Sequence, residues 1–363
     1  MKKNFQTARR NNEDCFINRN GISKGGTMKK IFQTVMVLTL LLSFTQVWAA
    51  DTINGAGASF PFPIYSAWAF DYNKATGVKL NYQSIGSGGG IRQITERTVD
   101  FGATDAPLKT EQLAKAKLLQ FPAVIGGVVP VVNIAGVNSG DIRFDSDTLA
   151  KIFLGEIKYW DDNKIKSLNT KLNLAHSEIT VVHRSDGSGT TAVFTEYLNG
   201  VSPDWKKKVG AGTSVQWPVG IGGKGNEGVA QYTRSTPNSI GYVEFAYAEQ
   251  NKMTYALLKN GAGTFVTPSF DAFEDAADTA TFDAKNHFYL WLVNAPGKNS
   301  WPIAGATFIL LAQEKPDSNK KVINFYDWSF KNGDSKAKEL IYVPLPKSLK
   351  DKIRAYWKAN GLQ

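Results

Sequence analysis

Cysteine is almost absent from this chain of 363 residues, because Cys15 is the only one. A fold stabilised by disulfides is therefore excluded, and so is a zinc site built from cysteines. The three histidines, His176, His183 and His287, lack the spacing of metal ligands, so we expect no metal. No apolar run of about 20 residues follows residue 50, and we expect no membrane insertion there.

The first 49 residues differ in character from the rest. Residues 1–27 are polar, basic and without pattern, which predicts a non-structural upstream extension. Residues 28–49 have a short basic start, an apolar run at 31–44 and a small-x-Ala cleavage signal at 47–49, the anatomy of a secretory signal peptide. No cysteine follows, so we expect no lipid anchor but a processed product in a bacterial periplasm.

The strongly basic balance of the chain, +10 overall, arises partly in these first residues. Residues 50–363 hold 34 Lys and Arg against 30 Asp and Glu, a net charge near +4. No basic stripe interleaved with aromatic residues remains, so we expect no nucleic-acid partner.

Segments of two kinds alternate from residue 50 onward. Apolar runs predict strands at 78–85, 99–104, 125–134, 179–184, 240–245 and 306–312. Helical spacing predicts helices at 63–76, 91–98, 110–119, 147–155, 191–200, 227–235, 320–330 and 337–343. This alternation predicts an α/β fold of mostly parallel sheets flanked by helices. The region 256–299 is expected to form surface structure with one short helix.

Four turns share one design, in which a strand ends, small residues turn the chain and a helix begins. They are GAGASFPFPIY (55–65), SIGSGGGIRQI (84–94), GATDAPLKTEQL (102–113) and HRSDGSGTTAVF (183–194). The first N–H groups of a helix lack internal partners and face the positive end of its dipole, so they bind anions. Each turn alone is also explained as an ordinary N-cap. Four such turns and an arginine in one chain support two interpretations about equally: a single small-oxyanion site, or four separate N-caps.

Several stretches in this order resemble the periplasmic phosphate-binding proteins of ABC-type high-affinity phosphate (Pst) transporters. The motifs are INGAGASFPFPIY (53–65), YQSIGSGGGIRQI (82–94), VDFGATDAPL (99–108), FPAVIGGVVPVVN (121–133), KIFLGEIKYWDD (151–162), RSDGSGTT (184–191) and IGYVEFAYA (240–248). The resemblance covers nearly all of the chain after the signal peptide. It implies a two-lobe periplasmic binding protein of type II-like α/β fold, with crossover strands as hinge. It also implies that the protein captures inorganic phosphate between the lobes and delivers it to the membrane permease subunits of an ABC transporter.

The resemblance carries a set of phosphate ligands onto this chain. They are Ser59, Phe60, Ser87, Asp105, Arg184, Asp186, Ser188, Gly189 and Thr190. The family often has Thr in place of Ser59, Ser in place of Gly88 and Arg in place of His183, and the last difference puts only a peripheral charge in doubt.

Two aspartates in an anion site need a physical reason. Phosphate at neutral pH keeps at least one proton and sulfate keeps none, and an ionised carboxylate can only accept hydrogen bonds. Asp105 is therefore expected to accept a hydrogen bond from a phosphate OH and to repel sulfate. Asp186 is expected either to orient Arg184 for bidentate contact or to cap the helix that follows, and both roles are compatible.

The lobes are predicted as 50–127 plus 300–363 and as 128–299. The hinge candidates are the crossover strands VIGGVVPVVN and WPIAGATFILL. A monomer is expected, and binding is expected to shift an equilibrium between open and closed lobes.

Other functions are less well supported. A phosphatase that holds phosphate as product needs a nucleophile with a base, or a metal cluster, and neither Ser87 nor Ser188 lies in a G-x-S-x-G motif, so no enzyme is expected. An adhesin or phosphate sensor is a third alternative. GIGGKG (220–225) fits a dinucleotide fingerprint, but it lies deep in the chain without a second nucleotide half. We interpret it as a tight structural loop near the cleft and expect no cofactor.

Overall fold

The structure is a computed structural model, and it describes residues 51–362. A mixed sheet of nine strands forms the centre of these residues. The predicted upstream extension and signal peptide lie outside the described residues. The strand order is β2-β1-β3-β12-β4-β8-β6-β7, and β9 pairs with β4 off this path. The strands are β1 (Thr52–Gly57), β2 (Lys79–Ser84), β3 (Phe101–Thr104), β4 (Leu118–Asn133), β6 (Thr180–Arg184), β7 (Ile221–Gly223), β8 (Ser239–Glu244), β9 (Thr254–Tyr255) and β12 (Ala304–Ala312).

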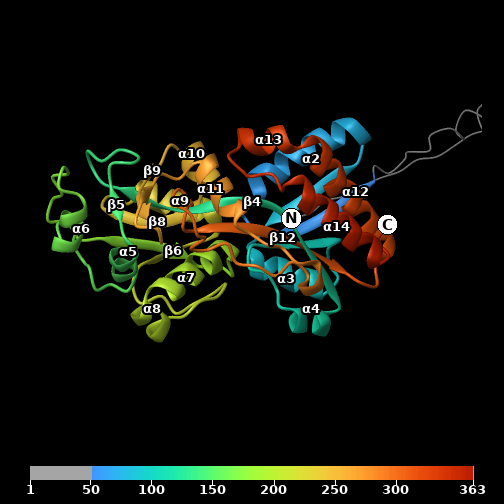
Figure 1. The fold of residues 1–363 in the computed structure, drawn as a ribbon, viewed down its shortest axis with the longest axis horizontal. Helices are drawn as coiled ribbons and strands as arrows, with labels where there is room; N and C mark the ends of the chain where they lie inside the picture. The colour runs from blue at the N-terminus through green and yellow to red at the C-terminus, as the bar shows by residue number, and fades with distance from the viewer. Residues whose placement is uncertain (1–50, 363) are drawn as a thin grey trace, which may run out of the picture. The chain divides into compact units, whose positions relative to one another are not determined.

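The two ends of this sheet are parallel and its middle is antiparallel. Strand β1 pairs in parallel with β2 and β3, and β6 pairs in parallel with β7 and β8. Strand β12 runs antiparallel to both β3 and β4, and β4 runs antiparallel to β8. We call the half with β1, β2 and β3 lobe I and the half with β6, β7 and β8 lobe II (Figure 1). The predicted two-lobe α/β architecture is confirmed.

Helices flank the sheet in both lobes. Those of lobe I are α2 (Phe62–Thr76), α3 (Ser87–Thr95), α4 (Thr110–Ala116), α12 (Pro316–Asn332), α13 (Asp334–Glu339) and α14 (Lys347–Ala359). Those of lobe II are α5 (Ser146–Phe153), α6 (Asn163–Leu168), α7 (Gly189–Val201), α8 (Pro203–Lys208), α9 (Gly225–Ser235) and α10 (Phe245–Gln250). None of the helices among residues 51–362 is long and apolar enough to span a bilayer.

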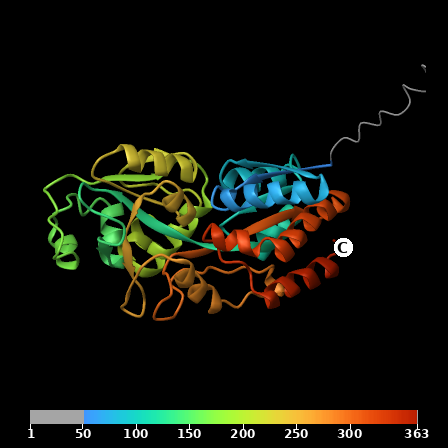
Figure 2. The ribbon, with the colours of Figure 1, turned by 90° about the horizontal axis from the view of Figure 1, so that it is seen from above.

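Strand β4 carries the chain from lobe I into lobe II. The first part of β4, through Gly127, pairs with β12, and its second part, from Val128, pairs with β8. Figure 2 shows β4 running from one lobe into the other. The predicted lobe border at 127/128 falls where the pairing partner of β4 changes, while the border itself and the hinge role stay predictions.

Strand β4 begins earlier than its apolar run predicts. The helix expected at 110–119 ends at Ala116, because Lys117 takes a left-handed φ of 53° and turns the chain. Leu118 and Leu119 then enter the strand and are buried. Apolar residues at this junction fit both the helical and the strand period, so periodicity alone misplaced the boundary between α4 and β4.

The region 256–299 contains the one short helix that was expected. Helix α11 (Phe270–Asp278) packs on β4 and β12, and a 3₁₀ turn follows at Ala284–Asn286. A second, three-stranded sheet in the order β11-β10-β5 is formed by β5 (Arg143–Phe144), β10 (Leu257–Lys259) and β11 (Phe265–Val266).

Aromatic side chains fix the helices of lobe I on its sheet. Tyr326 of α12 makes edge-to-face contacts with Tyr65 of α2, Phe101 of β3 and Phe121 of β4, at centroid distances of 5.7–5.8 Å. All four are buried. Such pairs stabilise a core beyond the area that they bury. They hold the sheet and α2 rigidly together, and the turn between β1 and α2 is the first of the four predicted anion turns.

Candidate anion-binding site

Lobe I brings three of its turns to the seam with lobe II. Ser59 and Phe60 follow β1, Ser87 opens α3, and Asp105 follows β3. All four residues are buried. Because β1 and β3 are parallel neighbours, the turns at their carboxyl ends meet at one edge of the sheet.

Lobe II presents the fourth turn from the opposite side. Arg184 ends β6, and Ser188 is the N-cap of α7, where its hydroxyl accepts from the Thr191 N–H over 2.9 Å. Gly189 and Thr190 are the first residues of α7, so their N–H groups have no carbonyl ahead of them in the helix. The helix therefore offers donors at the positive end of its dipole.

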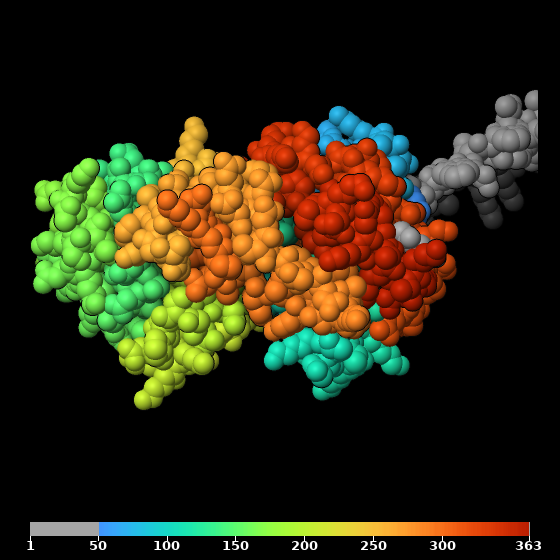
Figure 3. Space-filling view, viewed as in Figure 1, coloured from blue at the N-terminus to red at the C-terminus, as the bar shows by residue number. Residues whose placement is uncertain are grey.

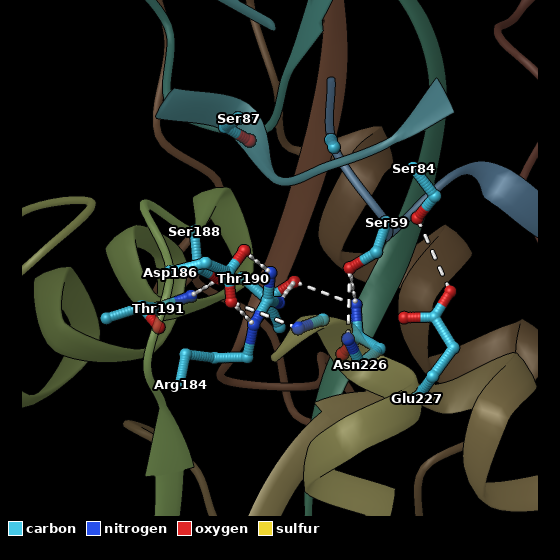
Figure 4. Close-up of polar contacts among 12 residues, drawn as sticks. Ser59, Ser84, Ser87, Arg184, Asp186, Ser188, Thr190, Thr191, Asn226 and Glu227 are labelled. Atoms are coloured by element: carbon cyan, nitrogen blue, oxygen red, sulfur yellow. Dashed lines mark hydrogen bonds and ion pairs between the residues drawn. The ribbon is translucent and has the colours of Figure 1, made fainter. Parts of the chain in front are cut away.

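The buried Arg184 and the partly buried Asp186 form an ion pair, shown in Figure 4. The guanidinium donates from Nε to Oδ1 over 2.8 Å and from Nη2 to Oδ2 over 2.6 Å. Burial favours the neutral acid, but the hydrogen bonds and charge of Arg184 hold the pKa of Asp186 below its usual value. The expectation that Asp186 orients Arg184 describes this geometry, whereas the N-cap of α7 is Ser188 and not Asp186.

The two lobes touch closely at this point. A Cβ atom added at Gly189 would lie 2.6 Å from the Cβ of Asp105 and closer still to the hydroxyl of Ser87. Nearby, the N–H of Gly88 donates to the carbonyl of Gly187 over 2.8 Å. The start of α7 therefore needs glycine to reach the two lobe I side chains.

Asp105 is a buried carboxyl with a single hydrogen-bond donor and a raised pKa. Thr307 donates to its Oδ1, while its Oδ2 is buried and has no hydrogen-bond partner among residues 51–362. Burial raises the pKa of Asp105 to about 7, against the opposing effects of the Thr307 hydrogen bond and the charge of Arg184. An orphaned buried acceptor beside helix N–H donors fits a ligand that carries both negative oxygens and a proton.

Phe60 and Thr190 are also held in place at the seam. The Phe60 carbonyl accepts from the hydroxyl of Tyr342 over 2.7 Å, which fixes the turn before α2. The Thr190 hydroxyl accepts from Arg184 Nη1 over 3.4 Å. The structure thus brings together all nine residues that the sequence selected, although their role as ligands stays a prediction.

Asn226 was missed by the sequence analysis. It lies in α9, directly after the glycine loop, and its side-chain amide donates to Ser59 over 2.9 Å and to Thr190 over 3.1 Å (Figure 4). The neighbouring Gly225 N–H donates to Asp186 over 3.0 Å. The loop therefore supports the site, as its position near the cleft suggested, but only the sequence order GKGN hinted at a polar side chain there.

Thr307 was missed as well, because it lies inside the apolar run of β12 and no turn marks it. Among the described residues no group of three His, Cys, Asp or Glu side chains lies close enough together to hold a metal ion.

Comparison with known proteins identifies the family of this chain. The family model for the PBP superfamily domain matches residues 45–332. The phosphate-binding protein PstS of Pasteurella multocida is 53% identical over 328 residues, covering 90% of this chain and 95% of the relative. The protein of the same name from Haemophilus influenzae is 52% identical over 336 residues, covering 92% and 99%.

A solved structure shares the fold. A high-affinity periplasmic phosphate-binding protein, PfluDING, determined with bound phosphate, aligns with a TM-score of 0.67 and 23% identity over 84% of this chain and 93% of its own. On its sequence relatives and its family model, this chain belongs to the PstS family of phosphate-binding proteins within the PBP superfamily.

Proposed function

We propose that the protein captures inorganic phosphate between its two lobes and delivers it to the permease subunits of an ABC transporter. The observation that carries the proposal is the unpartnered Oδ2 of Asp105, buried beside the first N–H groups of α7. Phosphate supplies oxygens for those donors and a proton for that acceptor, whereas a sulfate ion supplies only oxygens.

The ligands are the nine residues that the sequence selected. Ser59, Phe60 and Ser87 supply hydroxyl and N–H donors from lobe I. Arg184, held by Asp186, and the first turn of α7 supply donors from lobe II. Hydrogen bonds to a charged group contribute roughly 1.5–3 kcal/mol each, so a handful supports sub-micromolar binding, which needs about 8 kcal/mol.

We infer that the protein acts as a binding protein and not as a phosphatase. Relatives with more than half of their residues identical to this chain are named as binding proteins. The lobe borders 50–127 plus 300–363 and 128–299, a monomeric state and export to the periplasm through residues 28–49 belong to the same proposal.

Calorimetric titration of the purified protein with phosphate and with sulfate tests this function. We expect tight one-to-one binding of phosphate and no heat from sulfate. Trp291 lines a groove of about 540 Å³ beside Ala106 and Thr213, at the seam of the lobes, so tryptophan fluorescence is expected to report closure. A protein that binds neither anion, or that releases phosphate from an ester at a rate set by Arg184 and Ser188, contradicts the proposal.

A further inference from the structure

Thr307 is a buried side chain of strand β12 with one polar contact. Its hydroxyl donates to Oδ1 of Asp105. No other group among residues 51–362 hydrogen-bonds the Asp105 carboxyl, because Oδ2 has no partner. The direction in which Asp105 points is thus determined by a residue 202 positions away in the sequence.

The pairing of β12 with β3 explains why Thr307 lies beside the end of β3. On its other side β12 pairs with β4, where Thr307 lies opposite Val124 and Phe308 opposite Pro122, so the extra residue of this bulge is Ala123 of β4. Bulges of this kind are frequent next to functional sites. Phe308 pairs with Thr104, the last residue of β3, so Thr307 lies opposite Asp105, the residue that follows.

We propose that Thr307 is a positioning residue for anion selectivity: by holding Oδ1 it directs Oδ2 toward the ligand and keeps the carboxylate an acceptor. This inference rests on the proposed function and names the group that controls its selectivity.

The physical reason lies in what the hydroxyl does to a buried acid. A hydroxyl that donates to a carboxylate stabilises the ionised form, which opposes the effect of burial. The hydrogen bond from Thr307 also fixes the rotation of the Asp105 carboxylate, so that Oδ1 has a partner and Oδ2 is free. Without it, Asp105 holds its own proton more readily, and a protonated carboxyl can donate to any anion. Discrimination between phosphate and sulfate then decreases.

Substitutions at position 307 separate this role from packing. Thr307→Val keeps the shape of the side chain and removes the hydroxyl, and Thr307→Ser keeps the hydroxyl and removes a methyl group. Thr233→Val is a matched control, because the Thr233 hydroxyl is buried in α9 without a hydrogen-bond partner among the described residues.

The experiment measures the dissociation constants of phosphate and sulfate for the full chain by calorimetry between pH 5 and pH 9. We expect Thr307→Val to lower the ratio of the sulfate constant to the phosphate constant by about tenfold, the effect of about 1.4 kcal/mol. The pH at which sulfate begins to bind is expected to rise by about one unit. Thr307→Ser and Thr233→Val are expected to keep the wild-type ratio and pH profile.

The inference is overturned if Thr307→Val has the same selectivity as wild type at every pH, while wild type binds phosphate. If circular dichroism shows that Thr307→Val is unfolded, Thr307→Ala takes its place, and its selectivity is compared with that of wild type at every pH. A loss of selectivity in the Ser variant equal to that in the Val variant also overturns it, because packing would then explain both. Failure of wild type to bind phosphate removes the proposed function and this inference together.

Discussion

Asn226 of lobe II donates its side-chain amide to the hydroxyl of Ser59 in lobe I over 2.9 Å, so one buried side chain joins the lobes at the candidate site. The same amide nitrogen donates to Thr190, and Oδ1 accepts from the N–H of Glu244 over 3.0 Å. Its donors and its acceptor are all engaged, which fixes the amide in one orientation. Ser59 is thereby left with its hydroxyl proton free for a ligand.

Asn226→Ala is expected to weaken phosphate binding by about tenfold. The substitution leaves the Glu244 N–H without its acceptor and removes one of the two donors to the Ser59 hydroxyl, which keeps the bond from the backbone N–H of residue 226. An unsatisfied buried group costs roughly 1–3 kcal/mol. Titration calorimetry measures the change, and Gln231→Ala on the exposed side of the same helix serves as control. Wild-type affinity in Asn226→Ala would mean that this link between the lobes does not contribute to the bound state.

The part of the site that the sequence could predict is the part at chain turns. Ser59, Ser87, Asp105 and Ser188 all stand where small residues turn the chain between a strand and a helix, and this local pattern is visible in one dimension. Thr307 has no such mark, because its role comes from the pairing of β12 with β3. The same limit explains β4, whose early start depends on burial against neighbouring elements and on the left-handed turn at Lys117.

The unliganded protein is expected to lose stability as pH rises through the titration of Asp105. Its pKa in the folded protein is about 7, above the value near 4 of an exposed aspartate. The folded state therefore binds the proton more tightly, and the free energy of unfolding falls as pH rises from about 4 to about 7. We expect Asp105→Asn to remove this fall and to be more stable than wild type at pH 8 by about 4 kcal/mol, because the two pKa values differ by about three units of about 1.36 kcal/mol each.

Urea unfolding in phosphate-free buffer at pH 5 and at pH 8 measures this difference. The amide keeps an oxygen for Thr307, so the variant preserves the hydrogen bond and changes only the charge. Equal pH dependence of wild type and Asp105→Asn would show that the carboxyl is not buried in the unliganded protein.

Removal of Asp186 is expected to destabilise the unliganded protein by about 3 kcal/mol. The Arg184 side chain is only 1% exposed, so Asp186→Ala leaves a buried charge without its counter-ion. Bound phosphate supplies a negative charge at the same guanidinium. The rise in melting temperature that phosphate produces is therefore expected to be larger in the variant than in wild type.

Thermal unfolding with and without phosphate provides the comparison. Asp161→Ala is the matched control, because Asp161 pairs with a His176 side chain that is 70% exposed, and such pairs contribute little. It is expected to change stability by less than about 0.5 kcal/mol. A phosphate-induced shift in Asp186→Ala no larger than that of wild type would contradict the proposed contact between Arg184 and the anion.

Gly189→Ala is expected to lower phosphate affinity by about a hundredfold without unfolding either lobe. The added methyl group would overlap Asp105 and the hydroxyl of Ser87 across the seam. Overlap of this kind costs roughly 1–3 kcal/mol. Because Gly189 belongs to lobe II and Ser87 and Asp105 belong to lobe I, the lobes can relieve the overlap by moving apart, so the cost falls on the closed, liganded state.

Gly200→Ala in the same helix separates this effect from helix propensity. A Cβ at Gly200 meets nothing within 4 Å, and alanine in place of glycine stabilises a helix by about 0.5–1 kcal/mol. The control is therefore expected to gain stability and to keep wild-type affinity. If Gly189→Ala binds phosphate as wild type does, the start of α7 does not approach Ser87 and Asp105 in the bound protein, and the anion cannot be held between them.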